Sequence, residues 1–369
     1  MKASVLKENL KTATNIASRF ISAKAQLPIL SNFLIKANKN KIQLLATNLE
    51  TSVSISVGAK VEEEGEIAVS GKALNDLISN LTSNSVDLIA IKEQLNVSSN
   101  NFNSNILGSV STEFPSLPFK SLDGAISIDH SLFTKALNKV LFAASFDETR
   151  PVLTGILFEF SGKNLTLVAT DGFRLSSYTV TLNSEVEMST FIVPRNVLLE
   201  ISKSQSASEV KVSFDKENNF AVFEVNDIVF SSRIIEGTYP DYKRIVPASF
   251  VSEIIVEKEL FDKSVKLASV FARESSNIIK FQIDSNNLII KAESSASGNQ
   301  ENSLEIKNTQ ISGGVFEIMF NYKFIEDLIK VIQSDFINIS FSGNNTAAKF
   351  FEESDNNFLH LIMPIKTTA

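Results

Sequence analysis

The side chains that most often carry catalysis are few and scattered in this chain of 369 residues. The two histidines, His130 and His360, lie in unrelated contexts, and there is no cysteine, which excludes disulfides and thiolate metal sites. Asp147 and Glu148 form an adjacent carboxylate pair at the end of an expected helix. Neighbouring side chains diverge there, so we interpret both as solvated charges. Phosphate-binding loops, dinucleotide-binding glycine patterns and zinc-protease signatures are missing. The sequence therefore predicts neither an enzyme active site nor a bound metal or cofactor.

Lysines are more informative, because they recur on three expected helices, one near the start of each third of the chain. Each pair lies opposite the apolar stripe of its helix. The pairs are Lys7 and Lys11, Lys135 and Lys139, and Lys263 and Lys266. Two interpretations remain open: ordinary solvated helix faces, or one positive surface built from several helices. The second would bind phosphates without sequence preference, since no aromatic side chains interleave with the lysines to stack on bases.

The helices belong to a pattern that occurs three times. The stretch 27–57 aligns without a gap on 150–180, and a weaker copy begins near Asn277. Val69 and Val193 hold the same place before a second expected helix, and they are 124 residues apart. A repeat of this length indicates three structural units of one topology. Within the second copy, the polar residues 161–164 predict a turn between two strands.

Each unit is expected to contain two amphipathic helices and two sets of antiparallel strands, which is an α+β fold. The helices are predicted at 5–20, 72–81, 130–145, 195–204, 257–273 and 322–333. Two helices on one face of a sheet would bury both apolar stripes, and the other face could meet water. Proline-containing linkers near 114–118 and 239–247 predict domains at 1–120, 121–248 and 249–369.

Composition limits the setting and the partners. There is no run of eighteen apolar residues and no N-terminal signal pattern, so we expect a soluble cytoplasmic protein without a membrane partner. The net charge of −7 disfavours a nucleic-acid partner on average. A positive surface can nevertheless coexist with acidic loops such as the one at 62–66.

Four motifs carry a resemblance to a known family. They are Leu27-Pro28-Ile29-Leu30, Ala169-Thr170-Asp171-Gly172-Phe173-Arg174-Leu175, Glu236-Gly237-Thr238-Tyr239-Pro240-Asp241-Tyr242 and Met363-Pro364. In this order and spacing they resemble the bacterial DNA polymerase III β subunits, the sliding clamps, over the whole chain. The resemblance implies three domains of the DNA clamp fold, with antiparallel sheets outside and two helices per domain inside. It also implies a homodimer closed head to tail into a ring around double-stranded DNA.

The implied function is to confer processivity without catalysis and without a cofactor. The ring would tether the catalytic subunit of the replicative polymerase, the clamp loader and other replication and repair proteins. The alternative hypothesis is a protein-only repeat scaffold that does not bind DNA.

The resemblance also assigns site residues. Lys24, Lys72 and Arg195 match positions that touch DNA in the family. An apolar cleft for partner peptides, between the second and third units, matches these positions: Leu153, Thr170, Gly172, Phe173, Arg174, Leu175, Pro240, Arg244, Ile245, Ile362, Met363, Pro364 and Ile365. The apolar members would form an adaptable wall, and the two arginines would pair with peptide carbonyls or acids.

A third assignment concerns the joint between subunits. Val270 and Phe271, at the end of the helix expected at 257–273, match apolar interface positions of the family. Phe102, in the last strand of the first unit, is expected to lie opposite them in the ring.

Overall fold

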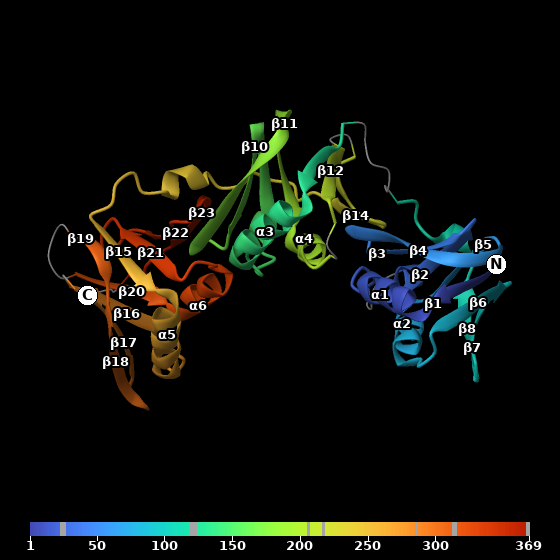
Figure 1. Ribbon diagram of the computed structural model, residues 1–369, viewed down its shortest axis with the longest axis horizontal. Coiled ribbons are helices and arrows are strands. Elements are labelled where there is room, and N and C mark those ends of the chain that lie inside the picture. The colour runs from blue at the N-terminus through green and yellow to red at the C-terminus, as the bar shows by residue number, and fades with distance from the viewer. Residues whose placement is uncertain are drawn as a thin grey trace. The chain divides into compact units, whose positions relative to one another are not determined.

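The computed structural model describes residues 1–22, 27–117, 124–204, 207–215, 218–284, 286–311 and 316–366. The chain forms two compact units (Figure 1). These two units do not coincide with the three sequence repeats, which are called repeats from here on. Unit 1 comprises Met1–Phe133 and Asn196–Ile234, and unit 2 comprises Thr134–Arg195 and Ile235–Ala369. No helix of the described ranges is both long and apolar enough to cross a membrane.

Unit 1 is built on one twelve-stranded antiparallel sheet. In hydrogen-bonded order its strands are β1 (Lys2–Leu6), β6 (Ser85–Ile91), β7 (Gln94–Ser99), β8 (Phe102–Ser109), β5 (Gly65–Ser70), β2 (Asn32–Asn38), β3 (Lys41–Thr47), β4 (Thr51–Glu63), β14 (Ile228–Arg233), β13 (Phe220–Val225), β12 (Glu209–Asp215) and β9 (Ile126–Asp129). β1 also pairs with β4, so the first eight strands close on themselves. The β4–β14 ladder then carries the same sheet from the first repeat into the second, where Ile55 faces Ile228.

The first two helices, α1 (Lys7–Ala17) and α2 (Gly71–Asn80), pack together against the first eight strands of the unit 1 sheet. Leu10 and Ala13 of α1 and Leu74 and Ile78 of α2 are buried, as the helical spacing of the apolar residues predicts. The Ser70 side chain accepts a hydrogen bond from the Ala73 amide and so caps α2. Most of α4 (Arg195–Ser202) also belongs to unit 1.

Unit 2 contains two sheets. The seven-stranded sheet has the order β10 (Gly155–Thr170), β11 (Arg174–Pro194), β23 (Asp355–Ile362), β22 (Ala348–Glu352), β21 (Phe336–Phe341), β15 (Ser252–Glu257) and β19 (Lys307–Ile311). The four-stranded sheet has the order β18 (Gly298–Glu305), β17 (Asn287–Ser294), β16 (Ile278–Ile283) and β20 (Phe316–Asn321). The helices are α5 (Lys258–Ala272), α6 (Tyr322–Val331) and most of α3 (His130–Val140). The β11–β23 ladder joins the second repeat to the third, with Leu175 facing Leu361.

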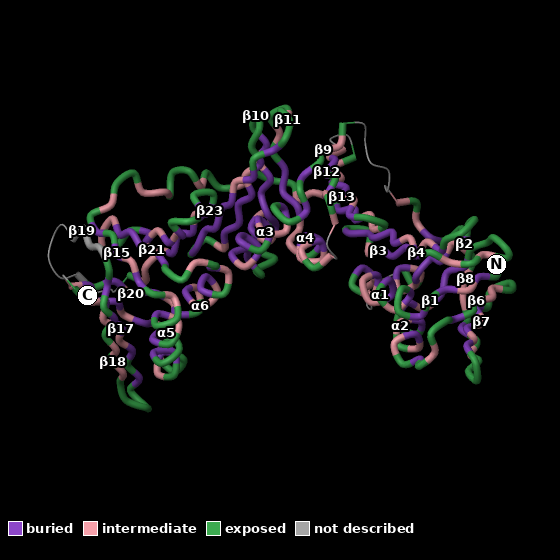
Figure 2. The backbone as a smooth tube through the Cα atoms, viewed as in Figure 1, coloured by how far each residue is buried: buried purple, intermediate pink, exposed green. Residues whose placement is uncertain are grey.

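Two local predictions were wrong. The segment 161–164 is not a turn, because β10 runs through it to Thr170 and only shifts its register with β11 near Gly162. Gly162 has φ +59, which lets the strand bend there, and the exposed bend of β10 and β11 is visible in Figure 2. The first helix begins at Lys7 and not at residue 5, since Ala3 and Val5 alternate with outward side chains in β1.

A buried pair of charges changes the expectation for the lysine face of α3. Lys139 is only 2% exposed and forms an ion pair with the equally buried Glu352. The other Glu352 oxygen accepts the Gln333 and Ser334 amides at 2.8 Å each, just beyond α6. Lys139 therefore joins α3 to β22 inside unit 2 and cannot offer its charge to DNA, so its assignment as a DNA-binding residue was wrong.

We expect Glu352→Gln to destabilise the protein strongly. The substitution keeps the side-chain shape but leaves the Lys139 ammonium buried without a counter-charge, which typically costs about 3–5 kcal/mol. Urea denaturation of the full chain should show a clearly lower midpoint than wild type. Lys263→Met is the matched control, because it removes an exposed ion pair with Glu259 and should leave the midpoint in place. Equal midpoints for both variants would contradict this account of Lys139.

Candidate partner and DNA interfaces

The turn between β10 and β11 is the centre of the candidate partner site. Gly172 has φ +91, a conformation that side-chain-bearing residues rarely adopt. One Asp171 carboxylate oxygen accepts both the Phe173 and the Arg174 amides at 2.9 Å. The Thr170 hydroxyl accepts the Gly172 amide at 3.0 Å and donates to the Arg174 carbonyl at 2.6 Å. The side chains of Thr170 and Asp171 thus fix the backbone of the turn. Phe173, which carries no such bond through its side chain, is 59% exposed at the rim of the candidate site.

An apolar cluster lies beside this turn, on one face of β10, β11 and β23. Its buried members are Leu157, Val168, Leu175, Ile192, Ala347 and Leu361. Partly buried residues packed against it are Val152, Ile235, Tyr239, Tyr242, Val246, Leu359 and Met363. The linker predicted at 239–247 therefore covers this face and forms part of the site. The Tyr242 hydroxyl donates to Glu159 at 2.7 Å, and burial raises the pKa of Tyr242.

The thirteen predicted partner positions separate into a surface and a support. Phe173 and Met363 meet at backbone level, because the Met363 amide donates to the Phe173 carbonyl at 2.8 Å, whereas the Ile365 amide donates to the Met319 carbonyl at 2.8 Å. Exposed or half-exposed members of the set are Gly172, Phe173, Pro240, Arg244, Ile245, Met363, Pro364 and Ile365. Buried members are Leu153, Thr170, Arg174, Leu175 and Ile362. The buried five lie beneath the surface and hold it in place.

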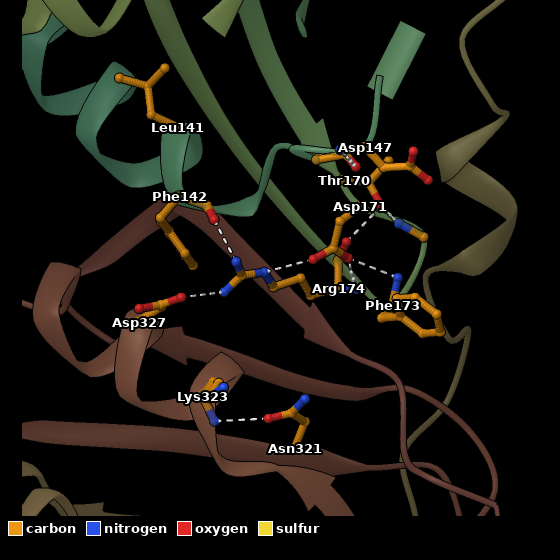
Figure 3. A network of polar contacts seen from close by, with 12 residues as sticks. Leu141, Phe142, Asp147, Thr170, Asp171, Phe173, Arg174, Asn321, Lys323 and Asp327 are labelled. Atoms are coloured by element: carbon orange, nitrogen blue, oxygen red, sulfur yellow. Dashed lines mark hydrogen bonds and ion pairs between the residues drawn. The ribbon is translucent and has the colours of Figure 1, made fainter. Parts of the chain in front are cut away.

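Arg174 differs most from its expected role. It is 7% exposed, and its guanidinium donates to Asp171 at 3.1 Å, to Asp327 at 2.9 Å and to the Phe142 carbonyl at 2.7 Å (Figure 3). All three of its nitrogens have partners inside the protein, so it is not free to pair with a peptide. Arg244 stays a candidate for that role, since its side chain is 86% exposed and, within the described residues, its ion pair is with the exposed Asp241.

The predicted DNA contacts differ in their exposure and in their contacts within the protein. Lys72 is exposed in the first turn of α2. The Arg195 guanidinium lies 4.6 Å from the centre of the exposed Phe146 ring and donates to the Leu141 carbonyl at 3.1 Å. Lys24 lies outside the described residues.

The lysines of the first helices are mostly paired. Lys263 and Lys266 are 63% exposed, but each forms an ion pair one turn away, with Glu259 and Asp262. Lys135 pairs with Asp355 at 2.6 Å. Lys7 is largely buried and pairs with Glu8 at 2.7 Å, so its expected place on an outer helix face was wrong. Lys11 is half-exposed.

Three features of these surfaces were not foreseen. Phe324 on α6 stacks on Phe173, with ring centres 6.5 Å apart. Leu267 on α5 is exposed beside the expected interface residue Val270. A cleft of about 780 Å³ in unit 1 lies between α1 and α4 and is lined by Arg19 and Lys203. Only Leu267 had a signal in the sequence, since an apolar residue outside the buried stripe of a helix marks a contact surface.

The expected subunit joint has open surfaces on both sides. Phe102 and Val270 are exposed, and Phe271 is half-buried. Among the described residues, β18 is hydrogen-bonded only to β17, and the 102–107 part of β8 only to β7. Each unit thus ends in a strand with a free edge, which is a template for pairing with another chain.

His360 lies in the same layer as Arg174 and is fully buried. Its ring centre is 5.1 Å from that of Phe142, and neither ring nitrogen has a hydrogen-bond partner within the described part of the chain. Burial, and next the charge of Arg174, hold the pKa of His360 well below its usual range. The described residues contain no cluster of histidine and acidic side chains that could hold a metal ion.

Comparisons with known proteins agree with this arrangement. The chain is similar to the beta sliding clamp of Staphylococcus epidermidis, with 28% identity over 376 residues and complete coverage of both chains. It is also similar to two solved structures of DNA polymerase III beta subunits. The Thermotoga maritima subunit is 27% identical with a TM-score of 0.91 and complete coverage of both chains. The Streptococcus pneumoniae chain is 26% identical with a TM-score of 0.92, over 99% of this chain and 100% of that one.

The fold is thus a three-domain DNA clamp fold, as expected. Profiles of the DNA polymerase III beta subunit match its N-terminal domain at residues 1–118, its central domain at 127–241 and its C-terminal domain at 243–366. The chain therefore belongs to the DNA polymerase III beta subunit family, the sliding clamps. Members of this family are non-catalytic, and nothing favours the alternative of a scaffold without DNA.

We expect acidification to destabilise the protein through His360. A histidine whose folded pKa is depressed takes up a proton on unfolding, so stability falls as the pH drops below about 6.5, the unfolded value, and continues to fall toward the folded pKa. His360→Leu removes this contribution. Urea midpoints measured between roughly pH 7 and pH 5.5, above most carboxylate titrations, should then depend less on pH than in wild type. Parallel pH profiles for the two proteins would contradict the neutral, buried state of His360.

Proposed function

We propose that two copies of this chain close head to tail into a ring around double-stranded DNA. The ring tethers the catalytic subunit of the replicative polymerase, the clamp loader and other clamp-binding proteins, and it works in the cytoplasm, where bacterial DNA lies. The observation that carries the proposal is the match of all three family domains, in order, along the whole chain. We propose domain boundaries at 1–120, 121–248 and 249–369.

DNA is held by encirclement more than by attraction in this proposal. Lys72, Arg195, Lys11, Lys135, Lys263 and Lys266 are the predicted phosphate contacts that keep some exposure, and Lys24 is retained from the family resemblance. Acidic neighbours on the same helix already pair with two of them. A protein that neutralises few phosphates releases few counterions, so its contact with DNA is weak, insensitive to sequence and suited to sliding.

The ring joint is a heterologous contact between the free edge of β8 in one subunit and that of β18 in the other. Phe102 lies on β8, and Val270, Phe271 and the exposed Leu267 supply an apolar patch on α5. Backbone pairing aligns the two edges, and burial of the apolar side chains provides most of the affinity.

The partner site is formed by the half of the predicted set that reaches the surface. Phe173 and Met363 lie at either side of one backbone hydrogen bond, with Pro364 and Ile365 beyond it. Pro240 and Ile245 contribute from the linker, and Arg244 offers an exposed guanidinium that pairs with the exposed Asp241. An apolar surface with one convergent cation suits a short peptide that carries hydrophobic side chains and an acidic or carbonyl group.

Retention on DNA tests the ring directly. Protein loaded on a nicked circular plasmid should stay bound during gel filtration and leave the DNA after the plasmid is cut once, because free ends let the ring slide off. Phe271→Asp places a charge in the subunit joint, so we expect it to sediment as a monomer and to be lost from circular DNA as well. Equal release from circular and linear DNA would reject encirclement. An intact Phe271→Asp dimer would reject only this placement of the joint.

Truncation of Met363 tests the partner site. Met363→Ala removes an apolar side chain from the surface, so the affinity for the polymerase catalytic subunit from the same genome should fall by roughly tenfold, as for loss of about 1.4 kcal/mol of apolar contact. The variant should remain a dimer in sedimentation, since Met363 follows β23 of the seven-stranded sheet and the proposed joint uses β8 and β18, which belong to other sheets. Unchanged affinity in surface plasmon resonance would remove Met363 from the site.

A further inference from the structure

We propose that Arg174 is a positioning residue of the partner site: it touches no bound peptide, and it fixes the Asp171–Phe173 turn by tying it to α3 and α6. The inference rests on the proposed function, because the turn matters only if partners bind beside it. It replaces the direct contact with peptide that the sequence suggested.

The strand register places Arg174 on the side of the sheet away from the apolar cluster. Side chains alternate along a strand, and the neighbouring Leu175 belongs to that cluster. Arg174 faces Ile362 across the β11–β23 ladder, and both are buried. Its side chain extends toward the helices, where Figure 3 shows it between Phe142 and Asp327.

The guanidinium connects three separate elements. Nε donates to Asp171 in the turn, Nη1 to Asp327 on α6, and Nη2 to the Phe142 carbonyl just beyond α3. Arginine suits this role, since its planar fork holds several acceptors in fixed directions, which a lysine ammonium cannot do. Three of its five N–H donors are used at 2.7–3.1 Å, and with only 7% of Arg174 exposed the remaining two have little access to an outside acceptor.

The contact with Asp171 reaches the rim of the site through the turn itself. Asp171 uses one carboxylate oxygen for the Phe173 and Arg174 amides and the other for the Arg174 guanidinium. A second cation, Arg150, donates to the Asp171 carbonyl at 3.4 Å. Loss of the guanidinium would release the second carboxylate oxygen, so the carboxylate could rotate away from the two amides and the turn would lose part of its constraint.

A second route runs through aromatic rings. The Arg174 guanidinium lies 4.7 Å from the centre of the Phe324 ring, and Phe173 stacks on that same ring. The backbone carbonyl of Phe173 in turn accepts a hydrogen bond from the Met363 amide. Arg174 therefore helps to set the position of Phe173 and, through it, of Met363, the two apolar side chains at the centre of the proposed surface.

A substitution at Asp327 distinguishes a positioning role of Arg174 from direct contact of Arg174 with the peptide. It lies on α6, with a side chain 35% exposed, and it reaches the partner site only through Arg174. If Arg174 contacted the peptide, Asp327→Asn would free part of the guanidinium and leave affinity equal or higher. If Arg174 positions the turn, the same substitution weakens binding, although residue 327 touches no peptide.

The experiment compares full-length dimers for binding to the polymerase catalytic subunit from the same genome. Asp327→Asn and Arg174→Lys should each lose roughly tenfold in affinity, as expected for loss of a hydrogen bond between charged groups. Lys330→Met is the matched control: Lys330 pairs with the same carboxylate at 3.0 Å from the solvent side, so its removal should leave affinity unchanged. Hydrogen exchange of the segment 171–175 should be faster in both test variants and unchanged in the control.

Five outcomes decide the matter. Weaker binding with faster exchange in Asp327→Asn supports the inference. Unchanged or tighter binding of Asp327→Asn overturns it, and weaker binding without faster exchange also overturns it, because the turn would then not be the intermediary. If Met363→Ala weakens binding and Asp327→Asn does not, the partner site stands and the role of Arg174 falls. If wild type does not bind the polymerase subunit, the proposed site itself falls, and the inference with it.

Discussion

The structure depends on one constraint, that an antiparallel strand at the edge of a sheet must find a partner or remain a docking surface. Within unit 1, β14 is the hydrogen-bonded partner of β4, and within unit 2, β23 is the hydrogen-bonded partner of β11. Each ladder turns two repeats into one continuous sheet with hydrogen bonds that do not depend on side-chain identity. Repeats only distantly similar in sequence can therefore be joined in the same way twice. The free edges of β8 and β18 would be joined in the same way between subunits of the proposed ring.

Charge is arranged for internal cohesion as much as for DNA. Lys139 with Glu352, Lys135 with Asp355 and Arg174 with its two aspartates all join the second repeat to the third inside unit 2. Buried ion pairs contribute little net stability, but any arrangement that separates the two charges is penalised. They therefore favour one register of the contact between the second and third repeats. Most of the predicted DNA contacts in the described part of the chain are already paired with an acidic side chain, which agrees with a protein that holds DNA by topology and lets it slide.

Much of the fold could be predicted from the sequence. The threefold pattern, the six helices and most strands follow from hydrophobic periodicity and from repeat spacing, since the buried faces of local elements are set by residues close in the chain. The strand preceding each first helix was missed, because Lys2–Leu6 is too short and too close to the helix for its alternation to stand out. The bend at 161–164 was read as a turn, because strand continuity depends on pairing with distant residues in β11.

The sequence by itself determined which family this chain belongs to, how many repeats it has and which turn lies at its proposed partner site, because motifs and periodicity are local. Only the tertiary structure decided what each charged residue does. Lys139 and Lys263 lie on the first helices of consecutive repeats, yet one is buried against Glu352 and the other is exposed. Arg174 and Arg244 were both expected to meet a peptide, yet Arg174 is buried among its partners and Arg244 is exposed. A charge is neutralised by groups near it in space, and those groups lie 213 residues away for Lys139 and 153 residues away for Arg174.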